Sequence, residues 1–117
     1  MTPRTIDGAR IDDLAGFYDE VTRSLFDGAS WGRNLDAFEE LLDEGLEVRW
    51  LDAERSRTRL GYAETARWLE ARLHRVAEEN RHEWQERLTA ARQGEGETLF
   101  EVLVRLMRER GVQLELA

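Results

Sequence analysis

Five carboxylates crowd one short stretch of this sequence, and they are the first residues whose types and spacing could do chemistry. They lie within nine positions with no basic residue among them: Asp36, Glu39, Glu40, Asp43 and Glu44. Paired carboxylates can act as general acid and base, but this requires a pocket that gives the two groups different surroundings. Acids repeated along one exposed helix face predict instead a surface that attracts a positively charged partner.

This crowding has a cost for the fold. Like charges three or four positions apart on a helix destabilise it by about 0.2–0.5 kcal/mol per pair. Asp43 and Glu44 would also lie at the C-terminal end of the helix, where the helix dipole disfavours anions. Two explanations stay open: the helix uses its charge to bind a partner, or it is simply acidic on its solvent side.

Other residue types give little support for catalysis or metal binding. His74 and His82 are the only histidines, and with Glu78 they would share one face of a continuous helix. Glu79 and Asn80 predict an interruption, so we expect surface histidines, no metal and no cofactor. No serine lies in a nucleophile-elbow context, and "GEGE" lacks the lysine of a phosphate loop. We therefore do not expect an enzyme.

Composition sets the broad class. A length of 117 residues fits one domain over 1–117. The sequence has no cysteine, which excludes disulfides and thiolate metal sites and favours the cytoplasm. No apolar run could span a membrane, and no apolar segment predicts a signal peptide. Residues 1–50 hold 12 acidic and 5 basic side chains, whereas residues 51–117 hold 13 and 12. This field repels nucleic acid and membranes and favours a basic partner, although it could serve solubility alone.

The elements that must position the acids follow from periodicity and capping. Asn34 is a good N-cap, and the helix it opens should run over 34–44 and stop at Gly45, with Leu35, Phe38, Leu41 and Leu42 facing inward. The pattern predicts strands at 4–8, 46–51 and 112–116. It also predicts a helix that begins at Asp12 or Asp13 and a last helix from Thr98 to Gly111. Residues 52–93 should be helical in pieces, with a cap at Asp52 and a restart at Asn80. Strands separated by helices predict an α/β fold with a small three-stranded parallel sheet and crossover helices.

The tryptophans divide into two groups. Trp50, Trp68 and Trp84 lie at apolar-face positions and are expected in the core. Trp31 lies in a turn-like stretch beside Gly32, where packing and partner contact are equally open.

Two adjoining stretches, "IDGARIDDLAGFYDEVTRSLF" and "ASWGRNLDAFEELLDE", resemble the barstar family of ribonuclease inhibitors. The shared pattern is a strand that ends in Asp-Gly, an amphipathic helix, and then aromatic-Gly-x-Asn-Leu-Asp-Ala leading an acidic helix. The final helix, Gly111 and the last strand also fit. The resemblance covers residues 4–51 and 97–116 and is weak over 52–96, where this chain is longer than barstar.

The resemblance implies that the acidic helix and the turn before it plug the active site of a basic ribonuclease, with carboxylates in the places of RNA phosphates. Asp36 and Glu40 fall at the positions of the family's key acids. The residues implied or expected to contact the partner are Trp31, Gly32, Asn34, Asp36, Glu39, Glu40 and Asp43.

This sequence also departs from the family pattern. Ser30 and Glu39 replace contact aromatics, Glu40 is one methylene longer than the family's aspartate, and Leu106 replaces a contact glutamate. These departures favour another basic ribonuclease or a related toxin over barnase as the partner. The alternative is an interaction or regulatory protein with the barstar fold and no ribonuclease target.

Overall fold

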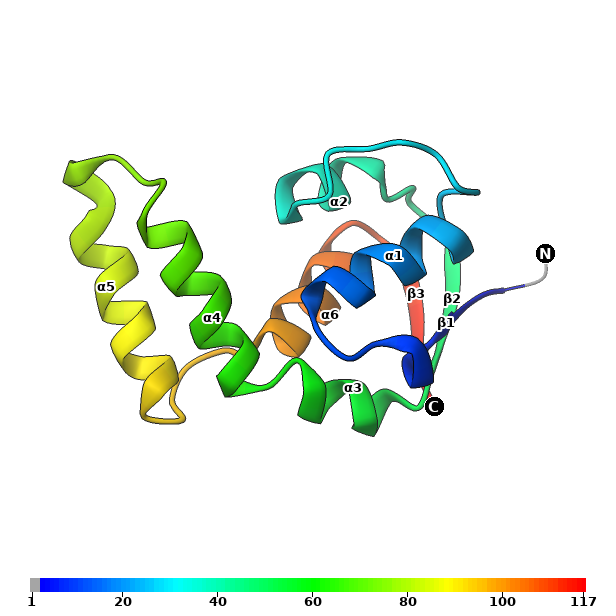
Figure 1. Ribbon diagram of the computed structural model, residues 1–117. Coiled ribbons are helices and arrows are strands. Elements are labelled where there is room, and N and C mark those ends of the chain that lie inside the picture. Colours follow the sequence, from blue (N-terminus) through cyan, green and yellow to red (C-terminus); the bar gives the residue numbers. More distant parts are fainter. Residues whose placement is uncertain (1–2) are drawn as a thin grey trace.

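Three parallel strands, β1 (Arg4–Asp7), β2 (Glu47–Leu51) and β3 (Gln113–Leu116), form one sheet in the order β1-β2-β3, as the sequence predicted. The computed structural model describes residues 3–117, so Met1 and Thr2, which open the segment considered for a signal peptide, lie outside it. Helices α1 (Leu14–Ser24), α2 (Leu35–Leu41) and α6 (Leu99–Glu109) lie on one side of the sheet (Figure 1). A 3-10 turn, η1 (Gly8–Arg10), connects β1 toward α1.

The core forms where β2 meets these helices. Trp50 is fully buried, and its ring lies 5.4 Å from Phe17 of α1 and 5.1 Å from Phe100 of α6. Its indole N–H donates to Ser56 Oγ at 2.9 Å, so this buried polar group is satisfied. The neighbouring Arg49 points to the exposed face, where it pairs with Glu115 of β3. The sheet therefore buries one face and leaves the other polar.

Three further helices fill the segment between β2 and α6: α3 (Ala53–Arg59), α4 (Tyr62–Leu73) and α5 (Glu78–Arg92). The last two form an antiparallel hairpin that extends away from the sheet (Figure 1). The hairpin has its own small apolar cluster around Leu69 and Leu88, separate from the main core. It stretches the molecule to 45 × 26 × 22 Å. None of the helices described for residues 3–117 is long and apolar enough to cross a membrane.

Side-chain caps open α1, α2 and α6, whereas α3 begins after Asp52 as predicted but without the capping bond, and the predicted restart at Asn80 was wrong. Asp13 caps α1, and Thr98 forms the predicted capping box with Glu101 at the start of α6. Asp52 has a positive φ of 52° and makes no side-chain cap bond. Asn80 lies inside α5, which begins at Glu78, so the interruption comes a turn earlier than predicted.

Candidate partner-binding site

Helix α2 carries fewer of the acids than the sequence predicted. Asn34 caps it as expected, because its Oδ1 accepts from the Ala37 amide at 2.8 Å. The helix ends at Leu41, so the predicted range of 34–44 with a stop at Gly45 was wrong. Leu42 leaves the helix in an extended conformation and is only 2% exposed.

The turn after Leu42, which leads into β2, is held by the turn that leads into β3. The Gly45 amide donates to the Gly111 carbonyl at 2.9 Å, and Gly45 and Gly111 both have positive φ. A Cβ on Gly111 would lie 2.7 Å from Glu44 Cγ, so the two turns are in close contact. This docking, rather than a helical C-cap, is the role of Gly45.

The acids therefore divide between two elements. Asp36, Glu39 and Glu40 lie on α2, whereas Asp43 and Glu44 lie in the turn that follows. The predicted repulsion between the helix dipole and Asp43 and Glu44 therefore does not apply, because these two acids lie outside the helix. Leu41, which was expected to face inward, is 43% exposed, and the fully buried Phe38 anchors α2 instead.

Trp31 lies in the loop before α2 and packs against α1. Its indole N–H donates to Thr22 Oγ1 at 2.6 Å, and its ring meets Tyr18 and Phe26 edge-on at 5.4 and 5.1 Å. Burial raises the pKa of Tyr18 to about 12, so this neighbour is uncharged at neutral pH. Trp31 is half-buried, and packing is the role that its contacts establish.

Arg33 ties the same loop to α1. Its guanidinium pairs with Asp19 at 2.6 Å and lies 5.9 Å from the centre of the Tyr18 ring. The exposed Gly32 beside it approaches α2 closely, since a Cβ there would lie 3.1 Å from that of Ala37. Sequence reasoning missed Arg33, because no local pattern links it to a partner fourteen positions earlier.

The carboxylates of this region share one electrostatic property. Among residues 3–117, none of the five acids forms an ion pair or accepts a side-chain hydrogen bond within the chain: Asp36, Glu39, Glu40, Asp43 and Glu44. No basic residue lies between Arg33 and Arg49. Glu39 is half-buried and the other four are exposed. Several acids elsewhere are neutralised, as Glu20 is by Arg23 at 2.6 Å, whereas here five neighbouring acids all lack such a partner. The negative charge of α2 and its turn is therefore uncompensated.

A cleft of about 170 Å³ separates α2 from the hairpin and α6. Asp36 and Glu39 line its α2 side, while Arg72 of α4 and Arg87 of α5 line the opposite side. Trp68 and Trp84, which were expected in the core, are only half-buried and line the cleft between these arginines. The sequence did not predict this juxtaposition.

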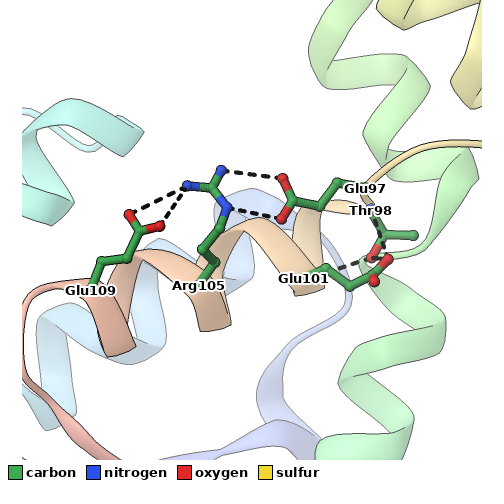
Figure 2. Close-up of polar contacts among 5 residues, drawn as sticks. All are labelled: Glu97, Thr98, Glu101, Arg105 and Glu109. Atoms are coloured by element: carbon green, nitrogen blue, oxygen red, sulfur yellow. Dashed lines mark hydrogen bonds and ion pairs between the residues drawn. The ribbon is translucent and has the colours of Figure 1, made fainter.

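A third arginine of the cleft, Arg105, is already neutralised. Figure 2 shows its guanidinium between Glu97, at 2.9 Å from Nε, and Glu109, with the Thr98–Glu101 capping box at the start of the same helix. The hydrogen bond with Glu97 is the main cause that raises the pKa of Arg105. Arg105 therefore stabilises α6 and contributes little free positive charge to the cleft.

The two histidines are not brought together. His74 follows α4 directly, and His82 lies within α5, where it contacts Glu86 at 3.0 Å. Across residues 3–117, no group of three potential ligands is placed to hold a metal ion.

Comparison with known proteins assigns this sequence to one family. A family model described as Barstar (barnase inhibitor) matches residues 1–116 and thus includes the segment 52–96, where the resemblance by motif was weak. Searches of curated proteins and of solved structures gave no significant match. Since the family model spans essentially the whole chain, and the three-stranded parallel α/β fold is consistent with it, the chain belongs to the Barstar (barnase inhibitor) family.

Proposed function

We propose that this protein is an inhibitor that binds a basic ribonuclease, or a related toxin, and blocks its active site with α2 and the loop before it. The single observation that carries the proposal is the uncompensated charge at 36–44 on a rigid support. Carboxylates without partners in their own chain lose little by moving into a partner's cationic site. The family model, which names a barnase inhibitor, supports the same activity.

The support for the acids matters as much as their charge. Phe38 is fully buried and packs 5.3 Å from Phe17, while the Asn34 cap fixes where α2 begins. Asp36 and Glu40 lie one helical turn apart and are both exposed. Two carboxylates held at this spacing can imitate consecutive negative groups of an RNA backbone without ordering a flexible loop on binding.

Within this proposal the seven expected contact residues have different roles. Asp36 and Glu40 supply the phosphate-like charges, and Asp43 adds a weaker contribution from the following turn. Trp31, Gly32 and Asn34 shape the loop that enters the active site, and Glu39 faces the cleft at its side. A non-enzymatic immunity role in the cytoplasm belongs to the same proposal.

The test is inhibition of RNA cleavage, followed by calorimetry. The protein is titrated against a panel of small basic ribonucleases that includes barnase and any basic nuclease encoded beside this gene. Asp36→Ala and Glu40→Ala should each weaken binding by about 2–5 kcal/mol, a range taken from the barnase–barstar pair of this family. Asp43→Ala should have a milder effect, and Glu95→Ala, an exposed unpaired acid between α5 and α6, should have almost none.

The variants also separate binding from folding. Because the acids on α2 repel one another and face solvent, Asp36→Ala and Glu40→Ala should melt at the wild-type temperature or slightly above it. Raised salt should slow association of the wild type more than that of either variant. If all three variants bind like the wild type, α2 is not the inhibitory element.

A second function is open on one observation: the two aromatic contact positions of the family are Ser30 and Glu39 here. A barstar-fold regulatory protein without a nuclease target would explain their loss. Capture from native lysate with mapped cross-links distinguishes the two. Cross-links from α2 to a protein without nuclease activity would favour the regulatory role.

A further inference from the structure

The cleft beside α2 contains two cations that nothing in residues 3–117 neutralises. Arg72 and Arg87 lie over the ring of Trp84 at 4.7 and 4.5 Å, and Arg87 also lies 5.7 Å from the centre of Trp68. Neither forms an ion pair with a described carboxylate, although Asp36 lines the opposite side. Stacking on tryptophan holds a guanidinium in place without using its N–H donors.

One of these donors is left without an acceptor. The Nε atom of Arg72 is buried, and it is the one buried side-chain polar atom among the described residues that makes no hydrogen bond. Buried donors are nearly always paired, because leaving one unsatisfied destabilises the protein. Since Nε itself is closed off, the donors of Arg72 left for an acceptor outside the chain are its terminal Nη groups, which also make no hydrogen bond within residues 3–117.

The hairpin that presents these arginines is fixed at its base. Glu64 accepts from the Leu14 amide at 2.7 Å, and Thr65 accepts from the Leu99 amide at 2.8 Å. The first turn of α4 is therefore bonded to the starts of α1 and α6. This arrangement holds Arg72 and Arg87 at a defined position opposite α2.

We propose that the α4–α5 hairpin is a second arm of the inhibitory surface, and that the cleft receives an acidic segment of the ribonuclease. A partner carboxylate pairs with Arg72 and Arg87 while the partner's basic residues meet Asp36 and Glu40. The partner that fits is thus a basic enzyme with an acidic loop beside its active site. This inference rests on the proposed function and adds a specificity determinant to it.

The sign of the mutational effect tests this pairing. Arg87→Gln changes the formal net charge from −8 to −9, which by long-range steering alone would strengthen association with a basic partner. Local pairing predicts the opposite, a loss of about tenfold or more in affinity. Arg59→Gln, at an exposed arginine of α3 that forms no ion pair in residues 3–117, is the matched control and should bind like the wild type or slightly tighter.

The probe is the ribonuclease of the panel that the protein inhibits most strongly, measured with wild type, Arg87→Gln, Arg72→Gln, Arg59→Gln and Asp36→Asn. If Asp36→Asn weakens binding and both cleft variants match Arg59→Gln, the hairpin inference is overturned and the proposed function stands. Tighter binding of Arg87→Gln would show a hairpin that shields α2, and it would also overturn the inference. If no ribonuclease is bound, or Asp36→Asn has no effect, both proposals fail.

A measurement on the unmodified protein guards against a misfolded hairpin. Hydrogen–deuterium exchange of the wild type, with and without the catalytically inactive ribonuclease, should show slower exchange in α2 and in the facing parts of α4 and α5. Protection of α2 with unchanged exchange in the hairpin would overturn the second arm, whatever the variants show.

Discussion

The body and the hairpin of this protein hold their shape in different ways. The body buries a run of aromatic rings, with Phe17, Phe38, Trp50 and Phe100 each at most 1% exposed. Among its described apolar residues the hairpin buries only Leu69, Leu88 and Ala91, and it places its tryptophans half-exposed under arginines. The body can therefore carry unneutralised acids on a rigid helix, whereas the hairpin depends on its bonded base and on surface stacking.

The contrast extends to electrostatics. Within residues 3–117, the acids at 36–44 of the body form no ion pair, and neither do Arg72 and Arg87, the hairpin cations that line the same cleft. Opposite charges thus face each other across a cleft without forming ion pairs. A binding surface with both signs can select a partner by its pattern of charge as well as by its net charge.

Matched leucine truncations give the largest expected effect. Leu103 of α6 is fully buried in the main core, and Leu103→Ala should lower the free energy of unfolding by about 2–5 kcal/mol across the whole protein. Leu88→Ala, in the hairpin cluster, should cost less although Leu88 is also buried, because that cluster is small and its site can collapse more readily. Chemical denaturation measures both. An effect of Leu103→Ala below about 0.5 kcal/mol would mean that α6 is not central to the core.

The bond that joins hairpin to body comes next. Thr65→Val keeps the shape but removes the acceptor for the buried Leu99 amide, which should cost about 1–3 kcal/mol. Thr89→Val, at an exposed position of α5, removes only a bond to its own helix and serves as the control. Equal melting temperatures for the two variants would show that the base of the hairpin is not fixed by this contact.

A smaller effect appears at high pH in the body. The Tyr18 pKa of about 12 exceeds the value of about 10 expected in the unfolded chain, so the fold favours the neutral phenol. Stability is therefore unaffected by this group below about pH 10, and it falls as pH rises from about 10 toward 12, because the unfolded chain ionises first. At pH 11 the loss should be on the order of 1 kcal/mol at most, since partial solvent exposure screens the effect, and Tyr18→Phe should remove it. Parallel pH profiles of unfolding for wild type and variant would contradict the assignment.

Chelation should have the smallest effect of all. His74 and His82 are exposed and far from forming a three-ligand group, so EDTA should leave the melting temperature unchanged. A clear drop on chelation that zinc reverses would show that metal, and not the bonded base and the stacking on tryptophan, stabilises the hairpin.

The sequence by itself determined the elements whose signals are local. Strand alternation, the Asn34 cap and the Thr98–Glu101 capping box each depend on residues within a few positions, and each was predicted correctly. The acidic stretch at 36–44 was equally visible, because charge is read directly from residue type.

Only the tertiary structure decided where α2 stops and what faces it. Leu42 leaves the helix because burial in the core and the bond from Gly45 to Gly111 outweigh the local helical pattern, and those contacts join residues more than sixty positions apart. Arg72 and Arg87 reach the side of α2 because the base of the hairpin is bonded to the starts of α1 and α6. Such long-range contacts have no local signature, so the cleft could not be predicted from the order of the residues.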